Sequence, residues 1–140
     1  DPYLSRGLGD VYKRQGGSVK DTAQLALIEL GQESPEVAVQ SLLALDREVR
    51  AQATRAIGGW LARGDAEKNR RLAKLCRVAL VEALQDPEDM VQLQALRALS
   101  AVGRPEDAAA IAPLLESDAL LIRIEAAGAL IRLQEASTSG

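Results

Sequence analysis

The sequence repeats itself, and this restricts its possible folds more than any other feature. Four nine-residue segments align without gaps, each with a β-branched residue first, alanine fifth and eighth, and leucine or isoleucine ninth. They are VKDTAQLAL from Val19, VRAQATRAI from Val49, VQLQALRAL from Val91 and IRIEAAGAL from Ile122. Apolar residues at these spacings form one face of an amphipathic helix. Such units stack on their neighbours instead of surrounding one central core.

A second set of helical segments alternates with the repeated ones, at 35–45, 66–85 and 105–117. The repeated segments begin 30, 42 and 31 residues apart, and we place an insertion around 63–74 in the longest interval. Pro113 lies inside the third alternating segment and is expected to kink or shorten its helix. No alternating apolar pattern predicts a strand. The sequence therefore predicts an all-α fold, an α-solenoid of about seven helices in antiparallel pairs.

Three copies carry further shared residues around the repeated helix. These are Asp46, Val49, Arg50, Ala53, Ala56 and Ile57; then Asp86, Pro87, Val91, Ala95, Ala98, Leu99 and Gly103; then Asp118, Ile122, Arg123, Ala126, Ala129 and Leu130. This pattern resembles the HEAT repeat, in the short form found in bacterial proteins, over roughly residues 18–135. The resemblance implies a solenoid fold and indicates almost nothing about function. The first copy lacks its leading helix.

Residues 1–15 differ from the rest of the chain. They lack helical periodicity, are weakly basic and contain both tyrosines. Codons for residues 10–15 can be read as GATGTGTATAAGAGACAG, which resembles the transposase end sequence of sequencing libraries, and residues 5–9 fit the adjoining adapter. We therefore expect a disordered, non-native tail at 1–15, a repeat array at 16–136 and a flexible C-terminus at 137–140. The chain is then a fragment of a larger HEAT-repeat protein. The alternative is a native basic arm.

Composition excludes several kinds of site. The chain has no histidine and one cysteine, Cys76, so it can form no Ser-His-Asp triad, no His-ligated metal site and no internal disulfide. Three aromatic residues are too few for a base-stacking platform. No apolar run approaches the roughly 20 residues of a membrane helix, and the N-terminus does not resemble a signal peptide. We expect a cytoplasmic protein without cofactor, metal or membrane contact.

Exposed positions on the repeated helices are the candidate binding surface. They are Lys20, Gln24, Arg50, Thr54, Gln92, Leu96, Arg123 and Ala127. Their mixed charge favours an unknown protein partner over nucleic acid. For Arg50, Arg123 and their equivalents, the HEAT resemblance implies another role, which we favour: bridging adjacent repeats. The nearby acids are Asp21, Asp46, Asp89 and Asp118.

A basic run is the strongest local charge feature. It consists of Arg63, Lys68, Arg70, Arg71, Lys74 and Arg77. Helical spacing predicts that Arg70, Lys74 and Arg77 share one face. That face could contact phosphate or an acidic partner, or it could simply be solvated. The net charge of −3 favours the solvated face.

Two further features are expected to serve packing. Trp60 and Cys76 are predicted core residues, because each falls among apolar residues at helical spacing. Gly58 and Gly59 precede Trp60 inside a helix, where glycine is unfavourable by about 1 kcal/mol relative to alanine. We expect the pair to permit a bend or a close approach between helices.

The function expected from the sequence is a non-catalytic protein-interaction or scaffold module that binds through a concave helical surface. One alternative is nucleic-acid or phosphate contact through the basic run at 63–77. Another is an accessory repeat region of a larger enzyme. HEAT-like repeats occur in phycobilin lyases and alkylpurine DNA glycosylases, but the site of neither can be mapped onto this sequence.

Overall fold

A computed structural model of the chain describes residues 19–138, which are all-α as predicted and contain no strand. The helices are α2 (Val19–Glu29), α3 (Glu36–Ser41), α4 (Arg47–Arg63), α5 (Arg70–Ala83), α6 (Asp89–Val102), α7 (Ala108–Ile111) and α8 (Leu120–Thr138). Two 3-10 segments, η1 (Pro105–Asp107) and η2 (Ala112–Glu116), flank α7. The predicted non-native tail at 1–15 lies outside the described residues, as do residues 16–18 and 139–140.

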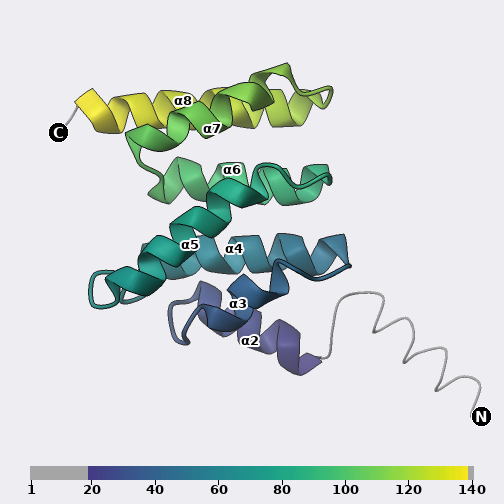
Figure 1. The fold of residues 1–140 in the computed structure, drawn as a ribbon, viewed down its shortest axis with the longest axis vertical. Helices are drawn as coiled ribbons and strands as arrows, with labels where there is room; N and C mark the ends of the chain where they lie inside the picture. Colours follow the sequence, from purple (N-terminus) through teal and green to yellow (C-terminus); the bar gives the residue numbers. More distant parts are fainter. Residues whose placement is uncertain (1–18, 139–140) are drawn as a thin grey trace, which may run out of the picture.

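The helices form two layers that grow along one direction (Figure 1). The repeated helices α2, α4, α6 and α8 lie side by side, and each contacts the next. In the second layer α3 packs on α4, α5 crosses both α4 and α6, and α7 with η2 covers α8. Most contacts therefore join elements that are near neighbours along the chain.

The core runs between these layers and is made of the repeat's apolar positions. The first position is buried in Val49, Val91 and Ile122, and the fifth in Ala53, Ala95 and Ala126. The second layer contributes Leu80 and Ile111, both fully buried, to the same cluster. The alanines leave room for the helix axes to approach, so the pattern that defines the repeat is also the pattern that packs it.

Several helix boundaries differ from those predicted. The helix α5 begins at Arg70 instead of 66, because the Asn69 side chain caps it by accepting a 3.2 Å hydrogen bond from the backbone N–H of Leu72. Helix α3 ends at Ser41, short of residue 45. Pro113 shortens its helix as predicted: α7 ends at Ile111 and continues as a 3-10 segment. Helix α8 extends to Thr138, two residues past the predicted end of the array, and the Thr138 hydroxyl donates to the Glu135 carbonyl.

The glycine pair of α4 permits close approach on two sides, as one of the two predicted alternatives stated. A Cβ added to Gly58 would lie 2.7 Å from the Cβ of Ala98 on α6. A Cβ added to Gly59 would lie 2.8 Å from the Cα of Glu29 on α2. Both distances are shorter than atoms tolerate, so α4 can contact both neighbours only because these positions lack side chains. Trp60 is buried in the core, as predicted.

Cys76 is fully buried on α5, as predicted, and burial raises the pKa of its thiol to about 11. The unfolded thiol ionises near pH 8.5. The stabilisation that comes from keeping the thiol neutral is complete below that pH and is lost as the pH rises toward 11.

We therefore expect the free energy of unfolding in urea to fall by about 2–3 kcal/mol between pH 8 and 11 through this group. The same titration on Cys76→Ala isolates the contribution of the thiol. Slow reaction of the native protein with a thiol reagent is expected at pH 8. Rapid labelling without unfolding would contradict the buried position.

Candidate functional site

The predicted binding residues do not form one exposed surface. Thr54 on α4 and Leu96 on α6 are fully buried, so the prediction that they are exposed is wrong. Both hold the sixth position of the repeat. Gly58, one helical turn beyond Thr54, directly faces α6, which shows that this side of α4 points at the next repeated helix. A repeated helix is thus buried both toward the second layer and toward its neighbours.

The second position of the repeat closes the turn that precedes each repeated helix. The side chains of Arg50, Gln92 and Arg123 each donate a hydrogen bond to the backbone carbonyl six residues earlier. The distances are 2.9, 3.0 and 2.7 Å. All three side chains are partly buried, and these bonds give them a structural role. Of the other predicted residues on α2, Lys20 is exposed and Gln24 is half-buried, while Ala127 on α8 is also half-buried.

Arg50 also bridges two repeats, which confirms the structural role favoured for it. Its Nε lies 2.8 Å from Asp86 Oδ2 and its Nη2 lies 3.3 Å from Oδ1, with both side chains largely buried. The hydrogen bond to Asp86 raises the pKa of Arg50. The partner is none of the four acids named from the sequence. Asp86 lies between α5 and α6, and the stacking of successive repeats places its carboxylate beside Arg50 of α4.

A groove does lie on the layer of repeated helices, at positions next to the predicted ones. We call it the arginine groove; its volume is about 350 Å³. It is lined by Glu29, Arg55, Gly58, Gly59, Ala62, Arg63, Gln94, Arg97, Ala98 and Ala101. Glycine and alanine make its floor, and the three arginines come from α4 and α6. The side chains of Arg55 and Arg97 are 64% and 53% exposed, so their guanidinium groups are open to a partner.

The charges of the arginine groove are only loosely satisfied within the chain. Arg55 Nε lies 2.9 Å from Glu29 Oε1, and Arg97 Nε lies 3.7 Å from Glu125 Oε1. Arg63 donates a 3.4 Å hydrogen bond to the Glu29 carbonyl. Exposed ion pairs of this kind contribute about 0–1 kcal/mol. The guanidinium groups can therefore exchange these partners for others at little energetic cost.

A helical wheel drawn from the core stripe could have found this groove. Arg55 and Arg97 both hold the seventh position of the repeat, which lies opposite the buried first and fifth positions. The predicted binding residues hold the second and sixth positions instead. Those positions point toward neighbouring elements, and the direction of the neighbours is set by the stacking.

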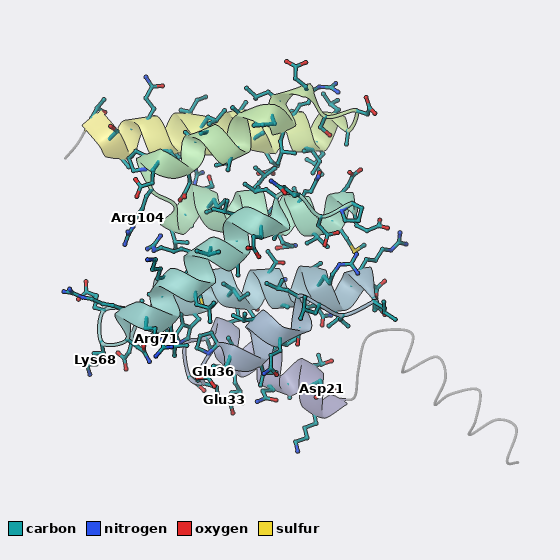
Figure 2. The ribbon with its side chains drawn as sticks, in the orientation of Figure 1. Asp21, Glu33, Glu36, Lys68, Arg71 and Arg104 are labelled. Atoms are coloured by element: carbon teal, nitrogen blue, oxygen red, sulfur yellow. The ribbon has the colours of Figure 1, made fainter. Side chains whose placement is uncertain are left out.

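The basic run does not form one cationic face. Arg71 lies in the first turn of α5 and lines the same pocket as Glu36 of α3, whereas Lys68 lies in the segment between α4 and α5 (Figure 2). Arg63 belongs to the arginine groove, and Arg77 turns inward, so the face predicted for Arg70, Lys74 and Arg77 is wrong at Arg77. The Arg77 Nη1 donates to the carbonyl of Val102, the last residue of α6. Burial lowers the pKa of Arg77, and the charge of Arg104 lowers it further. A cation at a helix C-terminus is a stabilising arrangement.

Arg71 and Lys74 border a second groove, which we call the α5 groove, with a volume of about 620 Å³. It is lined by Glu36, Asn69, Arg71, Leu72, Lys74, Leu75 and Val78. Leu75 and Val78 are each 46% exposed, so its floor is apolar. Glu36 places a carboxylate in the same groove, which disfavours a bound phosphate.

The part of the chain that the structure describes holds no cluster of acidic and cysteine side chains suited to a metal ion. Among the same residues, no helix combines the length and the apolar character needed to cross a membrane.

The fold is similar to that of a solved structure. No family model matches the sequence, and no curated protein matches it. A crystal structure described as an engineered protein, from the Northeast Structural Genomics Consortium, aligns with a TM-score of 0.57 at 26% sequence identity. The match covers 89% of this chain and 53% of the other, so the chain spans about half the length of that protein. The description of that protein names no activity, and the similarity concerns the fold.

Proposed function

We propose that this chain is a non-catalytic protein-interaction module, a solenoid of HEAT-like helix pairs that binds an acidic segment of a partner in the arginine groove. The observation that carries the proposal is the groove itself. Three arginines surround a floor of small residues on a layer of helices whose spacing is set by the core.

The shape of the groove suits a peptide backbone or a helix. Ala62 and Ala101, which are exposed, and Ala98, which is half-buried, let a partner approach α4 and α6 closely, because none of them projects beyond a methyl group. A partner that contacts these residues brings its side chains within reach of Arg55 and Arg97. Guanidinium groups bind carboxylates through paired hydrogen bonds, which adds geometric selectivity to charge attraction.

The chemistry of the groove favours binding over catalysis. Its lining holds one carboxylate, Glu29, and no serine, cysteine, lysine or tyrosine. Arginine remains protonated at any physiological pH and acts as neither a general base nor a nucleophile. Glu29 already accepts a hydrogen bond from Arg55. The groove therefore lacks a pair of groups between which a proton could be exchanged during a reaction.

The α5 groove supports a second candidate function. Its apolar floor and its cations Arg71 and Lys74 suit an amphipathic acidic helix. Both cations belong to the basic run, so the alternative of phosphate or nucleic-acid contact also falls on this groove. It is the second candidate because its lining sets two cations against one carboxylate, Glu36, whereas the arginine groove sets three cations against one.

A displayed library of random dodecapeptides tests the proposal. Peptides selected on the native protein are expected to be rich in aspartate and glutamate. Their affinity should fall at least about tenfold for Arg55→Glu/Arg97→Glu, since two attractive contacts become repulsive. The matched control is Arg71→Glu/Lys74→Glu, which makes the same charge change in the α5 groove and should leave affinity unchanged.

If affinity fell for Arg71→Glu/Lys74→Glu and stayed unchanged for Arg55→Glu/Arg97→Glu, the peptides would bind in the α5 groove. Peptides without acidic enrichment, or equal affinity for all three proteins, would contradict the arginine groove. Binding of a short DNA duplex at low salt is measured on the same three proteins. Binding that weakens steeply with salt and is lost in the Arg71→Glu/Lys74→Glu protein would establish the nucleic-acid alternative.

A further inference from the structure

Four charged side chains, one from each repeated helix, cross the layer that bears the arginine groove. They are Glu29 on α2, Arg55 on α4, Arg97 on α6 and Glu125 on α8, and we call them the charge row. Because α2, α4, α6 and α8 lie side by side in this order (Figure 1), the signs along the row are negative, positive, positive and negative. Stacking alone brings these charges together, since they come from four separate parts of the sequence.

The two arginines of the charge row pair outward, each with the glutamate on its outer side. Arg55 Nε lies 2.9 Å from Glu29 Oε1, and Arg97 Nε lies 3.7 Å from Glu125 Oε1. The lining residues that α4 and α6 contribute to the groove include no carboxylate. The arginine side chains are 64% and 53% exposed and both glutamates are 30% exposed, so all four charges are accessible. The centre of the row therefore attracts negative charge, and each end attracts positive charge.

The order of the charges in the row matters more than their sum, because salt screens distant charges. Electrostatic interactions decay over about 8 Å at physiological ionic strength. Packed helices lie about 8–10 Å apart. Each charge on a partner that crosses the layer therefore interacts mainly with the nearest charge of the row. A segment that is acidic along its whole length would place carboxylates against Glu29 and Glu125, which repel them.

We infer that the acidic segment of the partner contains two acidic residues and is bounded on each side by a basic residue, the charge order opposite to that of the row. This inference rests on the proposed function and specifies the partner of the same groove. The two acids lie against Arg55 and Arg97, and the two bases lie against Glu29 and Glu125. The partner crosses the repeated helices instead of running along one of them.

The spacing of the row suits an extended partner. A polyproline II segment has three residues per turn and rises about 3.1 Å per residue, so every third side chain lies on one side at intervals of about 9 Å. This interval matches the distance of about 8–10 Å between packed helices. Charges at every third residue of such a segment would therefore fall on successive members of the row.

Three synthetic peptides with capped ends test the inference, each with four charged residues separated by pairs of prolines. The matched peptide carries lysine, glutamate, glutamate and lysine in that order. The reversed peptide carries glutamate, lysine, lysine and glutamate, and the acidic peptide carries four glutamates. The matched and reversed peptides share one composition and have no net charge, so only charge order distinguishes them. Each order is the same in both directions, so the direction of binding does not affect the result.

The native protein is expected to bind the matched peptide at least about tenfold more tightly than the reversed one in an NMR titration, because four attractive contacts become repulsive. The acidic peptide should bind at least about threefold more weakly than the matched peptide despite its larger charge, since two of its carboxylates meet Glu29 and Glu125.

Exchanging the charges of the row should reverse the preference. Glu29→Arg/Arg55→Glu/Arg97→Glu/Glu125→Arg exchanges the sign of every member, so both internal ion pairs can form again and the net charge is unchanged. This variant is expected to bind the reversed peptide at least about tenfold more tightly than the matched one. Circular dichroism establishes that it is folded.

A second variant neutralises only the ends of the row, and it decides the question if the exchanged variant does not fold. Glu29→Gln/Glu125→Gln should bind the acidic peptide at least about threefold more tightly than the native protein does, since the repulsion at both ends is removed. The matched control is Glu36→Gln/Glu48→Gln, which makes the same charge change at exposed residues outside the arginine groove. Its affinity for the acidic peptide should stay within about twofold of the native value.

Equal affinity of the native protein for the matched and reversed peptides would overturn the inference. So would tightest binding of the acidic peptide, or binding of neither neutral peptide at about 5 mM. These outcomes leave the proposed function standing, because it depends on acidic enrichment in the peptide library and on loss of affinity in Arg55→Glu/Arg97→Glu. Failure of the library experiment would instead remove the proposed function, so the two failures are distinguishable.

Discussion

Replacing Arg50 by alanine is expected to lower the free energy of unfolding by about 2–4 kcal/mol. The Arg50 side chain makes two hydrogen bonds to Asp86 and one each to the carbonyls of Ala44 and Leu45. Its removal leaves the Asp86 carboxylate largely buried without its cation, and it opens the turn before α4. Truncation of one partner of such a pair is costly because the other charge remains desolvated.

The neighbouring pair on the same two elements provides the control. Arg47 Nη1 lies 3.4 Å from Glu88 Oε2, and these side chains are 58% and 40% exposed. Arg47→Ala is expected to change stability by less than about 1 kcal/mol, because exposed pairs contribute little. Urea unfolding of both variants measures the difference.

A double-mutant cycle with Asp86→Ala separates the bridge from the turn. The double variant should lose less than the sum of the two single variants, since the pair is broken once. Strict additivity would show that Arg50 acts only through the two carbonyls and that the bridge between repeats contributes nothing.

Alanine at Gly58 or at Gly59 is expected to lower the free energy of unfolding by about 1–3 kcal/mol, although glycine is the poorer helix former. Helix propensity alone favours alanine by about 1 kcal/mol. The added methyl group would overlap Ala98 in the first case and the backbone of Glu29 in the second. Neither obstacle is the end of a flexible side chain, so a whole helix must shift and the neighbouring core must open.

Gly128→Ala is the matched control, because it also replaces a glycine inside a helix. Its Cβ would meet nothing, so the propensity term should dominate and stability should rise by about 0.5–1 kcal/mol. Thermal unfolding compares the three variants. A rise in melting temperature for Gly58→Ala and Gly59→Ala would refute the close approach of α4 to its neighbours.

The helical core was predictable from the sequence for a specific reason. Apolar positions at spacings of four, three and one identify the side of each helix that must leave water, and their recurrence identifies the units that stack. Trp60 and Cys76 were placed correctly by the same rule. The shortening at Pro113 followed from backbone chemistry that does not depend on tertiary context.

The candidate site was less predictable, because an amphipathic stripe defines one buried side and a helix in this stack has several. Thr54 and Leu96 fall outside the stripe but face a neighbouring repeat, so they are buried. Arg77 follows the helical spacing of the basic run, yet α6 ends beside it, and the guanidinium of Arg77 caps α6 by donating to the carbonyl of Val102. The partner of Arg50 lies 36 residues away and cannot be identified without the offset between repeats.

The sequence by itself determined the all-α class, the number of helices and the main apolar stripe that each repeated helix turns to the core, because these depend on periodicity within each helix. Only the tertiary structure decided which polar side chains remain exposed to solvent, because that depends on the direction in which each helix meets its neighbours. The arginines of the groove and the charge row are therefore properties of the stacking, although every residue in them belongs to a helix that the periodicity predicts.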